Sequence, residues 1–230
     1  MTPPAITVEG PEYAKRVAEV ISAAFSTSSF TAYLLRKPGL TWPTDNIPAD
    51  VVGPHFRKNV TTRVGLGVEL VEAGDFAAVA VWFPPGVSIS TDGIADAKIL
   101  DYLDSLVSIR KEHLQGRKHW YLNLIWRHPQ RTEPGGSFVV QVVQLPSKIT
   151  SCDLTGTGAV RAVIEPYMEK AREQGVPLWL EAINDHARDV YQRFGSRIVA
   201  EVHVGAGMSN SRGELYESGR GLLAYAMMAG

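Results

Sequence analysis

Two spacings of hydrophobic positions alternate along the chain and predict the order of its secondary structure. Short apolar runs bounded by turn-forming residues are typical of strands, whereas apolar residues three and four positions apart are typical of helices. Strands are expected over residues 5–8, 68–73, 77–83, 120–126, 178–182, 198–204 and 222–228. Helices are expected over residues 12–25, 30–36, 55–63, 94–114, 159–174 and 186–194.

Turn and cap residues divide these elements. Gly74-Asp75 predicts a hairpin between two strands, and Asn184 or Asp185 is expected to cap the helix that Gly195 ends. Residues 40–54 hold three prolines and are expected to be a loop. The resulting order predicts one α/β (α+β) domain over residues 1–230, with a mixed sheet covered by helices on both faces.

Composition narrows the class of protein. Hydrophobic residues make up 45% of the chain and charged residues 20%, which is ordinary for a globular protein. Twenty-three basic against 24 acidic side chains give a net charge of −1, so bulk electrostatics do not favour nucleic acid. A single cysteine excludes an internal disulfide and a cysteine-rich zinc site. With no leader and no apolar run of about 18 residues, we expect a cytoplasmic protein that binds no membrane.

A glycine-rich segment at the start of a long helix is the first candidate for chemistry. Thr155-Gly-Thr-Gly-Ala-Val160 precedes a helical pattern, and free backbone N–H groups at a helix start can hold a pyrophosphate. The other interpretation is a glycine-rich turn. A dinucleotide-binding fingerprint would need glycine at Arg161, and no Gly-Lys-Ser/Thr follows, so neither common phosphate motif fits.

The second half of the chain carries several further motifs in a recognisable order. A strand reads Leu122-Asn-Leu-Ile-Trp-Arg-His-Pro129, a later strand ends in Leu-Glu181, and the next helix contains Tyr191-x-x-x-Gly195. With the glycine-rich segment between them, these motifs resemble the GCN5-related N-acetyltransferases, and within them the puromycin-acetyltransferase-like branch. Val79-Ala-Val-Trp-Phe-Pro-Pro-Gly86 is similar to that branch too. The resemblance covers roughly residues 68–228.

The resemblance implies a fold and an activity. The fold would be a single mixed, mostly antiparallel twisted sheet of six to seven strands, with a splayed central pair. The activity would be transfer of acetyl from acetyl-CoA, as co-substrate, to a small-molecule amine that attacks the thioester directly, without a metal. The alternative is a non-catalytic acyl-CoA-binding or interaction protein with a degenerate pyrophosphate loop. Thr155 and Val160 favour it, because they stand where the family has Gln/Arg and Gly/Ala.

The resemblance also implies roles for particular residues. The main chain of one strand would bind the pantetheine arm, and the glycine-rich segment would bind the pyrophosphate. These coenzyme-binding residues are Ile125, Trp126, Arg127, Thr155, Gly156, Thr157, Gly158, Ala159 and Val160. The glycine pair has two possible registers, with Gly158 as the central glycine or with Gly156 and Gly158 as the pair. The Arg127 side chain is expected to reach a phosphate or to point to solvent.

Two residues are candidate catalytic groups. Tyr191 matches the family tyrosine that protonates the departing CoA thiolate and would touch the coenzyme as well; the other interpretation is a core tyrosine. Glu181 is the candidate general base, against a purely structural carboxylate. Asn123 is expected to orient the amine. The aromatic residues of the first helices would line the acceptor pocket or belong to the core; they are Phe25, Phe30, Tyr33, Trp42 and Phe56.

The resemblance divides the domain into acceptor-side helices at about 11–64 and a CoA-binding core at about 68–228. About 23 extra residues, at roughly 133–155, separate the strand that ends at Pro129 from its glycine loop. They are either a genuine insertion on the surface or a retained intron. The expected partner is a small-molecule amine, and the protein is expected to be a monomer or a homodimer.

Overall fold

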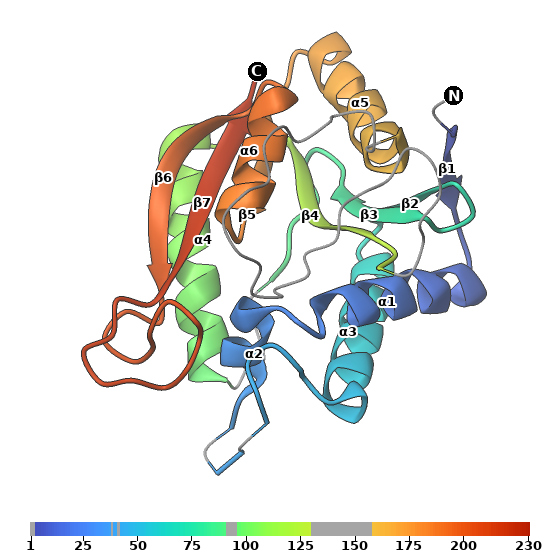
Figure 1. Ribbon diagram of the computed structural model, residues 1–230. Helices are drawn as coiled ribbons and strands as arrows, with labels where there is room; N and C mark the ends of the chain where they lie inside the picture. Colours follow the sequence, from blue (N-terminus) through green and yellow to red (C-terminus); the bar gives the residue numbers. More distant parts are fainter. Residues whose placement is uncertain (1–2, 38, 41, 91–95, 130–157) are drawn as a thin grey trace, which may run out of the picture.

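A computed structural model describes residues 3–37, 39–40, 42–90, 96–129 and 158–230. Seven strands form one sheet in the order β1-β2-β3-β4-β5-β7-β6, and among them only β4 and β5 run parallel. The strands are β1 (Ala5–Val8), β2 (Glu69–Ala73), β3 (Ala78–Phe83), β4 (Trp120–Arg127), β5 (Leu178–Ala182), β6 (Arg197–Val204) and β7 (Leu222–Ala229). The expected mixed, mostly antiparallel sheet is confirmed (Figure 1).

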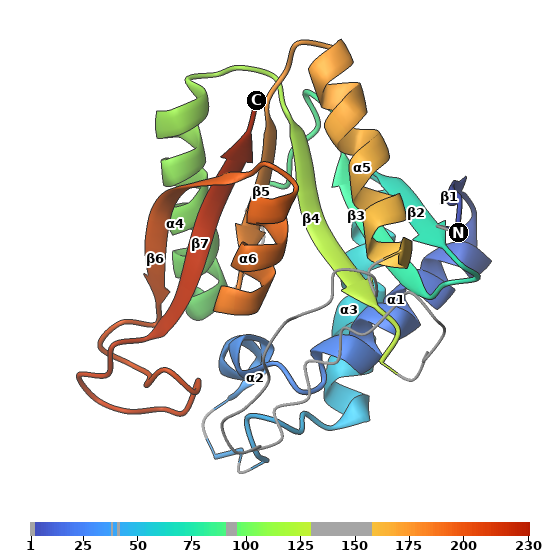
Figure 2. The same cartoon turned by 45° about the horizontal axis from the view of Figure 1, so that its top comes forward.

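The described residues form six helices around the sheet: α1 (Pro11–Phe25), α2 (Ser29–Leu35), α3 (Ala49–Val64), α4 (Ala97–Leu114), α5 (Gly158–Glu173) and α6 (Asp185–Arg193). Helices α5 and α6 pack on one face, in a core with Trp82, Leu122 and Leu180. Helices α1 and α3 pack on the other face, where α4 also lies. Figure 2 shows α5 in front of the strands and α4 behind them.

Helix α3 begins six residues before the expected helix, so the loop predicted over 40–54 is wrong in its last part. Pro54 lies inside the helix and removes one backbone donor. The apolar stripe of Val52, Phe56 and Val60 is buried against α1 and the sheet, and Asp50 in the first turn suits the positive helix end. Burial of this stripe outweighs the single lost hydrogen bond.

The predicted hairpin forms between β2 and β3, although its loop is longer than Gly74-Asp75. Ala73 pairs with Ala78, which leaves four residues in the loop. Asp75 and Phe76 have positive φ angles of 51° and 62°. The Phe76 N–H donates to the Glu72 carboxylate at 2.7 Å and thereby supports this conformation.

The central strands separate part of the way along their length. Strands β4 and β5 pair at Trp120↔Leu178, Tyr121↔Trp179 and Leu122↔Leu180, and no pairing follows in the described residues. Beyond Leu122, β4 continues along β3 towards α1, while β5 ends beside α6 (Figure 2). The expected splayed pair is therefore present, and it opens the sheet between β4 and β5.

Candidate functional site

A β-bulge marks the point where β4 leaves β5. Val81 pairs with Leu124 and Trp82 pairs with Leu122, so Asn123 is the extra residue of β4. Bulges bend a strand and redirect its side chains, and they are frequent beside active sites. The bulge therefore places Asn123 at the opening between the two strands.

Beyond the bulge, the backbone N–H and C=O groups of β4 point alternately towards β3 and towards the open edge of the strand. The His128 N–H donates to the Ala77 carbonyl at 2.8 Å, so position 128 directs its backbone groups towards β3. Because these groups alternate along an antiparallel pair, the N–H and C=O of Ile125 point away from β3. They face the open edge of β4, which no described strand covers beyond Leu122.

A narrow pocket lies on this open edge, between β4, α5 and α6. Five of the predicted site residues line it: Ile125, Trp126, Arg127, Val160 and Tyr191. The sequence had not indicated the other four, which are Asn184, His186, Ala187 and Val190. Three of them, His186, Ala187 and Val190, lie on the same helix as Tyr191. Val190 is three and four positions after the other two, so the helical period of α6 is a signal that could have found them.

The enclosed part of the pocket measures about 70 Å³. This is well below the several hundred Å³ of a pocket that encloses a whole ligand. A long, thin molecule would therefore place only a narrow part of itself here and lay the rest along the surface. An open strand edge that offers backbone groups suits an amide-containing arm.

The first turn of α5 forms one end of the pocket. Gly158, Ala159 and Val160 lie in this turn, which begins one residue earlier than expected and contains no acidic residue. The N-terminus of a helix attracts anions. Thr155, Gly156 and Thr157 lie outside the described residues, as does the predicted insertion at 133–155, so the expectations for them and for the glycine register stay predictions.

The Arg127 side chain does not point freely to solvent, which was one of the two expectations for it. It is buried, with 6% of its surface exposed, and it lines the pocket. The neighbouring Trp126 ring packs on the opposite face of β4 against Phe25, at 4.6 Å between ring centroids. Only the main chain of Trp126 therefore faces the side of the sheet on which α5 and α6 lie.

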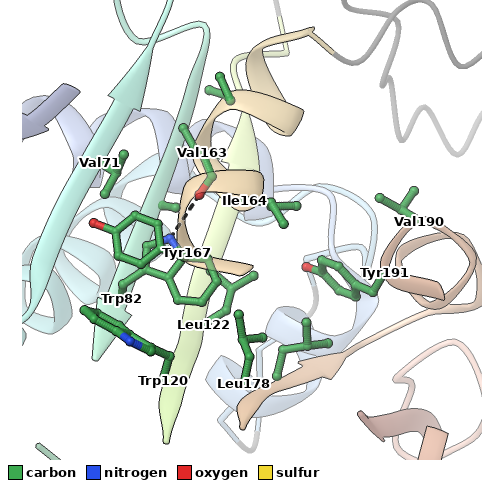
Figure 3. Packing of buried hydrophobic residues seen from close by; sticks show 14 of the residues in the cluster. Val71, Trp82, Trp120, Leu122, Val163, Ile164, Tyr167, Leu178, Val190 and Tyr191 are labelled. Atoms are coloured by element: carbon green, nitrogen blue, oxygen red, sulfur yellow. Dashed lines mark hydrogen bonds between the residues drawn. The ribbon is translucent and has the colours of Figure 1, made fainter. Parts of the chain in front are cut away.

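Tyr191 occupies the centre of the site. The Asn184 side chain caps α6 by accepting a hydrogen bond from the Ala187 N–H at 2.8 Å, and Tyr191 follows one turn after Ala187. Its ring points from α6 towards β4, as Figure 3 shows. Burial, followed by the charge of Glu181, raises the pKa of Tyr191. The phenol thus stays protonated at neutral pH and keeps a proton that it can donate.

Glu181, at the end of β5, is buried among polar partners. Its Oε1 atom pairs with Arg110 of α4 at 3.2 Å and accepts a hydrogen bond from Trp179 at 2.6 Å. These partners explain how a carboxylate with a side chain that is only 5% exposed can exist there. Both partners contact the same carboxylate oxygen, Oε1.

Asn123 forms hydrogen bonds to Tyr121 on its own strand and to Arg63 on α3. Its amide donates to the Tyr121 hydroxyl at 2.9 Å, and its oxygen accepts a hydrogen bond from Arg63 Nε. Burial and the nearby Glu181 raise the pKa of Tyr121. Arg63 was not singled out in the sequence, because a basic residue in the last turn of a helix is ordinary there.

The aromatic residues of the first helices belong mainly to the core. Phe25, Phe30, Tyr33 and Phe56 are buried, and Trp42 packs against the same core as Phe25. The ring of Phe30 packs against the ring of Tyr102, with 5.0 Å between the ring centroids.

Neither a membrane span nor a metal site is evident in the part of the chain that is described. None of the described helices is both long and apolar enough for a lipid bilayer. The described residues contain no group of three or more His, Cys, Asp or Glu side chains that is arranged to hold a metal ion.

Known proteins resemble this chain in sequence and in fold. Residues 12–88 match the model of the YOR012W acetyl transferase domain. The uncharacterized protein YDR391C of Saccharomyces cerevisiae is 29% identical over 223 residues, which cover 94% of this chain and 83% of the relative. The uncharacterized N-acetyltransferase C550.08 of Schizosaccharomyces pombe is 26% identical over 141 residues, which cover 55% of this chain and 49% of the relative.

Among solved structures, arylalkylamine N-acetyltransferase 2 from Aedes aegypti is similar in fold. Its TM-score is 0.59 at 14% identity, and the match covers 97% of this chain and 96% of that one. Residues 12–88 thus match the model of an acetyltransferase domain, and the chain shares the fold of a solved N-acetyltransferase.

Proposed function

We propose that this protein is an acetyl-CoA-dependent N-acetyltransferase that acts on a small-molecule amine. The observation that carries the proposal is the junction of two regions at the β4–β5 opening. A narrow pocket with an open strand edge lies on the side of α5 and α6, and a cluster of polar side chains lies on the side of α3 and α4.

The pocket residues suit the coenzyme. The backbone of Ile125 on the open edge can pair with the amides of the pantetheine arm. The first turn of α5, from Gly158 to Val160, presents a positive helix end to a pyrophosphate. Acetyl-CoA would supply an activated acyl group in the form of its thioester.

The proposed chemistry needs one proton donor that this chain provides. The acceptor nitrogen forms a bond to the acetyl carbon while the carbon–sulfur bond breaks. Tyr191 donates its proton to the departing sulfur and regains one from solvent, and the amine loses one proton. A hydroxyl kept protonated by burial and by Glu181 suits this role as donor.

Acetyl-CoA binding tests the location of the coenzyme. Val160→Trp fills the pocket and is expected to weaken acetyl-CoA binding by at least tenfold in titration calorimetry. Val64→Trp is the matched control, because Val64 is 39% exposed at the end of α3 and lies outside the pocket. Equal affinities in both variants and the wild type would place the coenzyme elsewhere.

A titration with acetyl-CoA and amines separates the proposal from its alternative. Binding of acetyl-CoA without any acetylated amine from a broad panel would support a non-catalytic acyl-CoA-binding protein. Formation of an acetylated amine together with CoA supports the enzyme.

A further inference from the structure

A cluster of polar side chains lies at the opening between β4 and β5, on the side of α3 and α4. We call it the cleft cluster; it consists of Arg63, Tyr102, Arg110, Tyr121, Asn123 and Glu181. Hydrogen bonds and an ion pair join Arg63 to Asn123, Asn123 to Tyr121, and Arg110 to Glu181. The Arg110 guanidinium also lies over the Tyr121 ring, at 4.0 Å from its centroid.

The charges of the cleft cluster do not balance. Glu181 is its only carboxylate, and Arg110 is already paired with it. Arg63 forms no ion pair among the described residues. It donates hydrogen bonds to two neutral oxygens, those of the Asn123 side chain and the Asn59 carbonyl. The cleft cluster therefore carries one positive charge more than it neutralises.

The position of Arg63 makes this excess charge costly without a counter-ion. The residue is half-buried, and burial lowers its pKa, although an arginine stays charged at neutral pH. The groups that raise the pKa of Arg63 are the hydroxyls of Tyr121 and Tyr102, and no carboxylate is among them. A partly desolvated cation attracts an anion more strongly than an exposed one.

Arg63 also keeps hydrogen-bonding capacity for such an anion. A guanidinium has five N–H donors. The hydrogen bonds to Asn123 and Asn59 use Nε–H and one N–H of Nη1. Three donors are left on the Nη1 and Nη2 atoms, which is the end that binds carboxylates. The fixed Nε side orients this end through Asn123, the residue of the β4 bulge.

We propose that the acceptor is an amine that also carries a carboxylate, and that Arg63 binds this carboxylate. The inference rests on the proposed acetyl transfer and specifies its substrate class. A second ammonium group in the acceptor would instead meet Arg63 and Arg110, with Glu181 already engaged, and like charges in a desolvated cleft repel. Amino acids therefore suit the cleft cluster better than diamines or simple arylalkylamines.

Tyrosine and tyramine provide a direct test, since they differ only in the carboxylate. With acetyl-CoA and the wild-type protein, kcat/KM for tyrosine is expected to exceed that for tyramine by roughly 10- to 100-fold, the value of a charge-assisted contact. Phenylalanine and 2-phenylethylamine repeat the comparison without the phenol.

Variants assign the preference to Arg63. Arg63→Met is expected to reduce the ratio towards one, and Arg63→Lys to keep part of it. Arg57→Met makes the same change on the exposed face of α3 and is expected to leave the ratio as in the wild type. Acetyl-CoA affinity serves as the check that each variant is folded.

Different failures have different meanings. A wild-type ratio at or below one, with acetyl transfer to the carboxylate-free amine, would overturn the inference alone. A high ratio that Arg63→Met does not change would overturn the role of Arg63. Acetyl-CoA binding without transfer to any amine would overturn the proposed function and this inference together.

Discussion

Tyr191 is the residue on which the proposed chemistry depends most. Tyr191 lines the pocket that also contains the open edge of β4, and its pKa is raised by burial and by Glu181. A phenol with a raised pKa remains a donor at every pH at which the protein is expected to work. Its ionisation therefore does not limit activity on the alkaline side.

Removing this hydroxyl is expected to slow turnover with little effect on coenzyme affinity. Tyr191→Phe keeps the ring in the core but removes the donor, so kcat should fall roughly 100-fold. Steady-state CoA release measures kcat, and calorimetry measures acetyl-CoA affinity. Tyr167→Phe is the control, because Tyr167 is also buried but stacks on Trp82 outside the pocket. Unchanged turnover in Tyr191→Phe would refute the role as donor.

His55 predicts a pH dependence of stability. Burial, followed by the charges of Arg63 and Lys58, lowers the pKa of His55 to about 4 in the folded protein, against about 6.5 in the unfolded chain. The unfolded state then binds one more proton than the folded state between these values. Stability is complete above about pH 6.5 and decreases as the pH falls towards 4, by roughly 3 kcal/mol at most.

A comparison of melting temperatures checks this dependence. His55→Gln removes the titrating ring but keeps a polar partner for Asn59, whose amide contacts His55 at 2.8 Å. Between pH 7.5 and 5 the wild type should lose more stability than the variant. Parallel curves for the two proteins would contradict the assignment.

At the scale of elements, the ion pair between α4 and β5 links a helix to the end of the splayed strand. Glu181→Gln leaves the Arg110 charge buried without its partner and is expected to reduce the free energy of unfolding by about 3 kcal/mol. The double variant Arg110→Met/Glu181→Gln should recover most of this loss, as urea unfolding can measure.

The same double variant tests whether Glu181 is the general base. If the carboxylate accepts the amine proton, turnover stays low although stability returns. If turnover returns together with stability, Glu181 has only a structural role. A double variant no more stable than Glu181→Gln would contradict the proposed compensation between the two charges.

The sequence predicted most elements because local pattern and burial agree. Helix α6, which carries Tyr191, has a capping residue at Asn184 and a helical hydrophobic period. The hairpin at Gly74-Asp75 joins two runs that are rich in β-forming residues. The start of α3 was missed, because Pro48 and Pro54 indicate a loop locally while the buried stripe from Val52 to Val60 depends on tertiary contacts. Helix formation there is decided by packing, which proline positions alone do not reveal.

More of the pocket than of the cleft cluster could be predicted from the sequence. Ile125, Arg127, Val160 and Tyr191 lie in motifs, and they line one pocket. The cleft cluster was visible only as Glu181 and Asn123. Arg63 and Arg110 come from helices distant in sequence, so their approach to the β4–β5 opening depends on how α3 and α4 pack on the sheet.

At the scale of the whole molecule, coenzyme binding should stabilise the fold. The pocket joins α5, α6 and β4, so a ligand that binds only the folded state opposes global unfolding. At a concentration 100 times its dissociation constant, acetyl-CoA should add about 2.7 kcal/mol, or roughly 5–10 °C in Tm. Differential scanning fluorimetry measures the shift, and Val160→Trp should reduce it. No shift at millimolar acetyl-CoA would contradict binding.

We expect acetyl to pass from the coenzyme to an amine at the opening between β4 and β5. Mass spectrometry with acetyl-labelled acetyl-CoA and an amine panel that includes tyrosine and tyramine tests it most directly. We predict that label appears on the amine in step with CoA release, and that Tyr191→Phe slows both equally. CoA release without a labelled amine, or no release with any amine, would contradict the claim.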